Sequence, residues 1–172
     1  MKKSIYLIFS VMLCFLLCAC DPGSYKIDRE ELSRVTGVEL IQYDNPKQKQ
    51  FATWVPDQFR KLVPFQPENA TVLEALPEED IPDFLDSFAE TDILHTYYAY
   101  DSPKDVCLRL WYENGDFLII WANYQENSFA GYIGEYSSDG TVLSFWGSFS
   151  SLGDYKALVT QYFSCNFNEQ SE

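Results

Sequence analysis

Residues 106–124 read VCLRLWYENGDFLIIWANY, two largely apolar runs joined by the polar stretch Glu113-Asn114-Gly115-Asp116. Asn-Gly is the strongest short-range signal of a β-hairpin, because both residues adopt the positive φ angles of a type I′ turn at low cost. The sequence therefore predicts antiparallel strands over 106–112 and 117–124. Apolar residues at every second position of the first strand predict that one face of this hairpin lies in a core: Val106, Leu108, Leu110 and Tyr112.

Strand-like and helix-like segments surround the hairpin. Segments rich in β-branched and aromatic residues, each ended by turn residues, predict strands over 35–43, 71–76, 93–100, 131–136 and 141–149. Residues 47–69 combine aromatic residues with three prolines and predict either a helical turn or an irregular arm. Apolar residues three and four positions apart predict two amphipathic helices. The first carries Ile81, Phe84, Leu85 and Phe88; the second, capped by Ser150 or Ser151, carries Tyr155, Leu158, Val159, Tyr162 and Phe163.

The order of these elements predicts the fold class. A brief helix is expected after Asp28, and no regular strand–helix–strand alternation is present. We therefore expect an α+β fold, in which an antiparallel meander of four to six strands is covered on one face by two or three helices. The length of the chain, 172 residues, predicts a single domain over 28–166, followed by a frayed tail over 167–172.

The N-terminal segment has the features of an export signal. Lys2 and Lys3 precede an apolar run over 5–19, which is too short to span a bilayer and is followed by Asp21-Pro22-Gly23. At its end, Leu17-Cys18-Ala19-Cys20 resembles the lipobox of bacterial lipoproteins. The resemblance implies removal of residues 1–19 and acylation of Cys20. Residues 20–27 would then tether an extracytoplasmic domain to the lipid bilayer of the bacterial cell membrane; the alternative is a plain secretory signal.

The charge balance restricts the partners. The chain has a formal net charge of −14, and removal of Lys2 and Lys3, the only charged residues before Cys20, takes it to −16. Such a charge argues against nucleic acid and against direct docking on anionic lipid. It favours cationic or neutral partners, although an acidic surface that only keeps the protein soluble is the alternative.

Few residues point to metal or redox chemistry. Outside the signal and the acyl carrier, only Cys107 and Cys165 remain, and they form either one disulfide or two isolated buried thiols. His95 is the one histidine in the chain, and a place in a strand is expected for it. No spacing typical of a zinc site is present, and we expect no cofactor.

The aromatic residues are the better indication of a site. Trp111, Trp121, Trp146 and Tyr124 fall on predicted strands. Gathered on one sheet face, they would form a binding platform for a sugar, an apolar ligand or a protein. Trp111 alternates with the core positions Leu108 and Leu110 and is expected to be exposed or covered by another element. Trp121 is expected in the core because it lies on the same side of its strand as Phe117 and Ile119. Trp146 is expected there too, because it lies on the same side of its strand as Val142.

Sequence motifs of catalysis are not evident. The chain contains no Gly-x-Ser-x-Gly elbow and no phosphate-binding glycine loop. We therefore expect a membrane-anchored, non-catalytic binding domain for an unknown protein or glycan. The alternatives are a carboxylate-dependent envelope hydrolase, an inhibitor or immunity-type partner of a basic protein, and a structural lipoprotein without a ligand.

Overall fold

The chain folds around one antiparallel sheet. A computed structural model describes residues 24–25, 28–44, 64–91, 93–96, 106–123, 129–151 and 154–164. The sheet has the strand order β1-β4-β8-β7-β6-β5-β2-β3. Its strands are β1 (Ser24–Tyr25), β2 (Val35–Tyr43), β3 (Ala70–Ala75), β4 (Ile93–Thr96), β5 (Val106–Tyr112), β6 (Phe117–Asn123), β7 (Phe129–Tyr136) and β8 (Val142–Ser151). Six longer strands make up most of this sheet, and the short β1 and β4 extend one edge.

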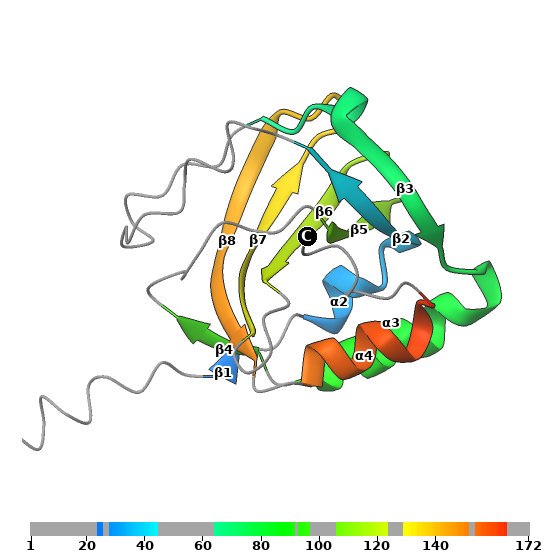
Figure 1. Cartoon of the computed structure of the whole chain (residues 1–172), viewed down its shortest axis with the longest axis vertical. Helices are drawn as coiled ribbons and strands as arrows, with labels where there is room; N and C mark the ends of the chain where they lie inside the picture. Colours follow the sequence, from blue (N-terminus) through cyan, green and yellow to red (C-terminus); the bar gives the residue numbers. More distant parts are fainter. Residues whose placement is uncertain are drawn as a thin grey trace, which may run out of the picture.

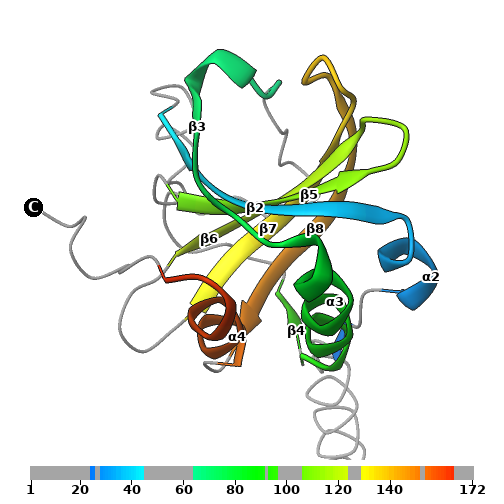
Figure 2. The same ribbon diagram turned by 90° about the vertical axis from the view of Figure 1, so that its right-hand side faces the viewer.

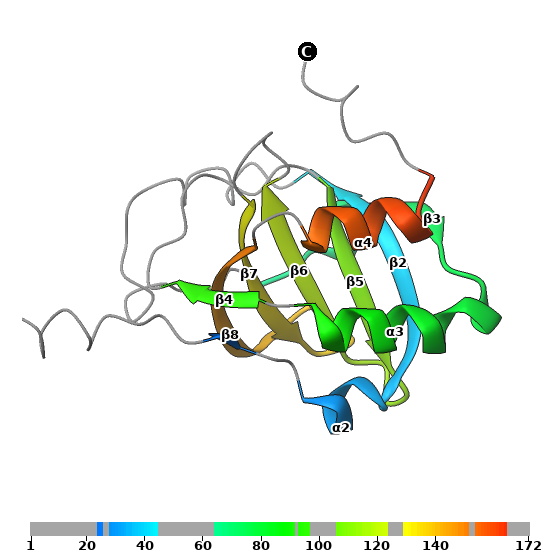
Figure 3. The ribbon, with the colours of Figure 1, turned by 90° about the horizontal axis from the view of Figure 1, so that it is seen from below.

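Helices lie against one face of the strongly curved sheet (Figure 1). The described residues form three α-helices: α2 (Arg29–Leu32), α3 (Ile81–Glu90) and α4 (Asp154–Tyr162). Figure 3 shows α3 and α4 side by side across the sheet, with α2 beside them at one end. Two 3₁₀ turns, η3 (Pro67–Asn69) and η4 (Glu78–Asp80), precede β3 and α3. The predicted α+β class, with an antiparallel sheet under helices, is confirmed.

Sequence periodicity explains the main core. Ile81, Phe84 and Phe88 on α3 are buried, as predicted, and so are Tyr155 and Val159 on α4. These helix faces pack on alternate residues of the central strands, which include Val38, Leu40, Leu108, Leu110, Leu118 and Ile120. Burial of a large apolar side chain stabilises the fold by roughly 1.5–3 kcal/mol. None of the helices in the described segments is long and apolar enough to cross a membrane.

The opposite face of the sheet also buries aromatic residues. Phe65 stacks on Tyr43, with ring centroids 4.5 Å apart, and packs edge-on against Phe117 at 5.2 Å. Its backbone N–H donates to the Gly140 carbonyl at 2.8 Å, which fixes it to the turn between β7 and β8. Phe65 falls in the segment for which a helical turn or an irregular arm is predicted; residues 45–63 lie outside the described part. The second core cluster consists of Ile41, Tyr43, Phe65, Cys107, Phe117, Ile119, Trp121 and Tyr136.

The central hairpin forms with a different turn from the predicted one. A type I′ turn would be closed between residues 113 and 116. Instead, the Gly115 N–H donates to the Tyr112 carbonyl at 3.0 Å, and the Tyr112 N–H donates to the Asp116 carbonyl at 2.8 Å. Gly115 has φ 86°. This is the pattern of a three-residue loop, in which glycine takes the left-handed position. Asn114 holds the loop because its Oδ1 accepts from the Asp116 N–H at 3.1 Å.

Helix starts follow local chemistry only in part. Asp28 caps α2 as predicted, and its side chain accepts from the Glu30 N–H at 3.0 Å. The predicted cap at Ser150 or Ser151 is wrong, because β8 continues through both residues and α4 begins at Asp154. Pairing of β8 with β4 and β7 uses the backbone groups that a helix start would need. Strand pairing therefore overrides the capping preference of serine.

Candidate functional site

The structure does not bring the three predicted tryptophans onto one face. Trp121 is buried in the second core cluster, and Trp111 packs against that cluster. Trp146 packs against the main core on the opposite, helix-covered face. Tyr124 lies outside the described residues. Val142 contacts the second cluster, so the expectation that Trp146 shares its face is wrong.

Irregular strand pairing explains the position of Trp146. The register between β7 and β8 shifts twice, between Ile133 and Gly134 and between Glu135 and Tyr136. Each shift inserts a residue of β8 and interrupts the alternation of sides, so counting positions from Val142 fails. Only the shift between Glu135 and Tyr136 lies between Val142 and Trp146, and Trp146 itself is the residue inserted at the other shift. Its half-buried ring therefore reaches the helix-covered face.

An ionic cluster fills the other face beside Trp111. Glu39 on β2 stands opposite Arg109 on β5. Its Oε2 accepts hydrogen bonds from Arg109 Nε at 2.8 Å, Arg109 Nη2 at 2.6 Å and Trp111 Nε1 at 2.8 Å. The Arg109 guanidinium lies over the Trp111 ring, 4.5 Å from its centroid. Gly37 leaves room for this ring, since a Cβ there would lie 3.4 Å from Trp111 Cδ1. The side chain of Arg109 is only 9% exposed, so we interpret the cluster as structural.

Two tyrosines lie buried in the second core cluster. Tyr136 is fully buried, with its ring stacked on Phe117 at 5.6 Å. Burial raises the pKa of Tyr136 above its ordinary value of 10.0, and a side-chain hydrogen bond with Trp121 lowers it in part. Tyr43, in the same cluster, accepts from the Gln66 N–H at 2.8 Å. The Tyr43 hydroxyl therefore helps to fix the backbone next to Phe65, and neither tyrosine faces solvent.

An open groove lies at the hairpin end of the helix-covered face. Arg34, Tyr112, Glu113 and Asn114 line it, and its volume is about 410 Å³. The Arg34 guanidinium lies over the Tyr112 ring, 4.8 Å from the centroid, and its Nη1 is 3.2 Å from Oε2 of Glu31. Figure 2 shows α2 at the start of β2, and Arg34 lies in the turn that joins them. The Glu113 N–H donates to the Arg34 carbonyl at 3.3 Å, so the groove is built from this turn and the hairpin tip.

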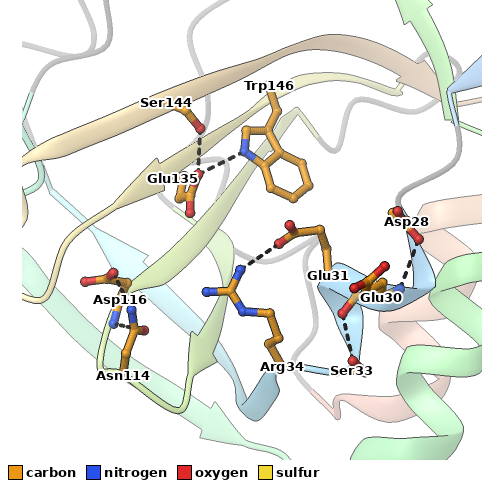
Figure 4. Close-up of polar contacts among 10 residues, drawn as sticks. All are labelled: Asp28, Glu30, Glu31, Ser33, Arg34, Asn114, Asp116, Glu135, Ser144 and Trp146. Atoms are coloured by element: carbon orange, nitrogen blue, oxygen red, sulfur yellow. Dashed lines mark hydrogen bonds and ion pairs between the residues drawn. The ribbon is translucent and has the colours of Figure 1, made fainter.

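A carboxylate–indole pair lies on the same face of the sheet, two strands away from the groove. Glu135 on β7 accepts hydrogen bonds at Oε2 from Ser144 Oγ at 2.7 Å and Trp146 Nε1 at 3.3 Å. Figure 4 shows Glu135 and Trp146 pointing toward Arg34 and Glu31. The register agrees with this view. Glu135 stands opposite Leu118, which stands opposite Leu110. Leu110 and Tyr112 share one side of β5, and two strand spacings separate β7 from β5, about 10 Å.

The groove and its border are acidic. Arg34 and Glu113 are the charged residues that line it, and Glu31, Asp116 and Glu135 add three carboxylates around it. Asp116 accepts from Asn114 Nδ2 at 2.7 Å and from the Ser138 N–H at 3.2 Å, which links the two hairpin tips. Excess negative charge around a partly enclosed space attracts cations. This surface is therefore suited to a positively charged ligand.

Other predicted positions bear less on the site. Cys107 is fully buried, whereas Cys165 and Cys20 lie outside the described residues, so both the disulfide and the acylation stay predictions. His95 lies in β4, opposite Phe149. Within the described ranges, no group of three or more His, Cys, Asp or Glu side chains is placed to hold a metal ion.

Sequence reasoning missed Arg34 and Glu135. One signal pointed to Glu135: it is a charged residue two positions from Ile133, on the side of its strand that faces the core. No protein-family model, curated protein or solved structure matches the chain. The chemistry of the groove is therefore the basis for a function.

Proposed function

We propose that the chain is a membrane-anchored, extracytoplasmic binding domain without catalysis, which takes its ligand in the groove between the turn after α2 and the β5–β6 hairpin. The observation that carries the proposal is the groove itself. Arg34, Tyr112, Glu113 and Asn114 combine an aromatic face, charges of both signs and an amide around an open volume of about 410 Å³. A few convergent polar groups beside an aromatic surface are typical of ligand sites.

The lipobox-like segment supports the location. Acyl chains on Cys20 hold a protein at a membrane because each buried CH₂ contributes about 0.8 kcal/mol. Only residues 21–27 separate Cys20 from the cap of α2 at Asp28. Arg34, which lines the groove just after α2, is thus close in sequence to the anchor, and the ligand would be met near the membrane surface.

Site-specific cross-linking in living cells tests the binding role. A photoreactive phenylalanine is placed at Asn114, in the groove, or at Glu79, an exposed residue of η4. We expect a covalent adduct of defined mass from the Asn114 position and a much weaker one from Glu79. Equal labelling from the two positions, or no adduct from Asn114, would show that the groove is not a binding site.

A further inference from the structure

We infer that the groove binds a polypeptide that places an arginine side chain beside the groove, between the carboxylate of Glu135 and the indole ring of Trp146. This inference rests on the proposed binding role of the groove and specifies its ligand. It comes from a comparison of two carboxylate–indole pairs within the same sheet, one with a guanidinium and one without.

The first pair shows the complete arrangement. Oε2 of Glu39 accepts from Trp111 Nε1 at 2.8 Å, and the same oxygen accepts from Arg109 Nη2 at 2.6 Å. The guanidinium covers the Trp111 ring at 4.5 Å. One planar cation therefore satisfies a carboxylate and contacts an indole face at the same time.

The second pair repeats the carboxylate and the indole. Oε2 of Glu135 accepts from Trp146 Nε1 at 3.3 Å and from Ser144 Oγ at 2.7 Å. These two donors fix the carboxylate, and Oε1 has no hydrogen bond to any side chain that the structure describes. No described cationic side chain covers the ring of Trp146. The pair is thus the arrangement of Glu39 and Trp111 without its guanidinium.

Arg34 does not take this place. Its guanidinium lies over Tyr112 at 4.8 Å and is paired with Glu31 at 3.2 Å. Arg34, Tyr112 and Glu31 together form another cation–ring–carboxylate group in the groove wall. Glu113 and Asp116 add negative charge at the hairpin tip, so the surroundings of Glu135 attract a further cation. An exposed arginine on a basic partner matches the missing component in charge and in shape.

A three-residue peptide isolates the proposed contact from general charge attraction. The acylated chain in detergent micelles is titrated with N-acetyl-Gly-Arg-Gly-amide, and the indole ¹⁵N–¹H signal of Trp146, assigned with Trp146→Phe, is followed by NMR. We expect a saturable shift of this signal. The matched peptide with citrulline, which keeps the shape of arginine but not its charge, should give none.

Substitutions then locate the contact. Glu135→Gln should weaken the arginine peptide about tenfold or more, because it removes a charge-assisted hydrogen bond. The control Asp83→Asn removes the same charge at an exposed position of α3 and should alter the affinity less than twofold. Unchanged indole signals of Trp111 and Trp121 verify the fold of each variant. If Glu135→Gln does not fold, Glu135→Asp, which withdraws the carboxylate, should give the same loss.

The outcomes separate this inference from the proposed function. If Glu135→Gln and Asp83→Asn weaken the arginine peptide equally, the guanidinium contact is wrong. It is also wrong if the Trp146 signal moves with an N-acetylglucosamine oligomer or a glutamate peptide and not with arginine, although the binding role then stands. A silent Trp146 signal with every probe overturns the inference, and the cross-link at Asn114 then decides the binding role independently.

Discussion

Glu39 and Arg109 face each other on neighbouring strands, and one carboxylate oxygen of Glu39 accepts two hydrogen bonds from Arg109, at 2.8 and 2.6 Å. The two residues are 70 positions apart in the chain. Their side chains are 9% and 21% exposed, for Arg109 and Glu39 respectively, so water screens this ion pair much less than it screens an ion pair at the surface.

Arg109→Met should destabilise the protein by about 3 kcal/mol, because Glu39 then keeps a poorly solvated charge without its partner. Urea unfolding measures the change. Arg29→Met is the control, since Arg29 pairs with Asp86 and Glu90 at the surface and its side chain is 61% exposed; a loss below about 1 kcal/mol is expected there. Equal losses in the two variants would contradict the structural role of the Arg109 pair.

Gly140→Ala should destabilise the protein far more than Gly115→Ala. Both glycines have φ 86°, so each alanine carries a backbone penalty of roughly 1–2 kcal/mol. At Gly140 the new Cβ would also lie 2.0 Å from the Phe65 carbonyl oxygen, whereas at Gly115 the nearest atom is Ser138 Cβ at 3.6 Å. Thermal unfolding of the two variants gives the comparison. Similar melting temperatures would show that the turn does not press on Phe65 in solution.

Stability should fall at alkaline pH through Tyr136. Its folded-state pKa is raised above 10.0, so the unfolded chain releases the proton first and stability is lost as pH rises above about 10. One such group contributes a slope of at most about 1.4 kcal/mol per pH unit. Tyr136→Phe should therefore show a shallower decline between pH 9 and 11 in urea unfolding. A parallel decline in the two proteins would assign the alkaline loss to other groups.

Cys20→Ser should abolish acylation and release the protein from the membrane fraction, or leave its precursor unprocessed. The expected charge of −16 repels anionic lipid, so the acyl chains supply the attachment. Mass spectrometry of the N-terminal peptide and membrane fractionation measure both effects. Cys18→Ser, a change within the signal, should leave acylation intact. Membrane retention of the Cys20→Ser protein would refute the lipoprotein assignment.

Local patterns predicted the regular elements well. Strands β2 and β5 have the predicted bounds, Val35–Tyr43 and Val106–Tyr112. The buried face of α3 is the one that Ile81, Phe84 and Phe88 define. In each case a single face of the element packs on a continuous core. The spacing of apolar residues along the sequence therefore predicts which residues are buried.

The candidate site could not be predicted in the same way. Trp146 lies on the other face from Val142 because one register shift between β7 and β8 separates them, and nothing in the local sequence marks its position. Arg34 reaches Tyr112 only because the turn after α2 lies beside the hairpin tip, where the Glu113 N–H donates to the Arg34 carbonyl at 3.3 Å. Both contacts depend on how distant segments meet.

The sequence by itself determined the α+β class, the central hairpin, the amphipathic helices and the acidic charge, since these follow from residue type and local spacing. It also carries the lipobox resemblance at Cys20, which is a prediction from residues alone. Tertiary structure decided which carboxylates have a cationic partner. Glu39 and Glu135 are both strand glutamates next to a tryptophan, yet pairing of β2 with β5 places Arg109 on Glu39, whereas the neighbours of Glu135 are Ser144 and Trp146. Strand register, which acts over tens of residues, makes that difference.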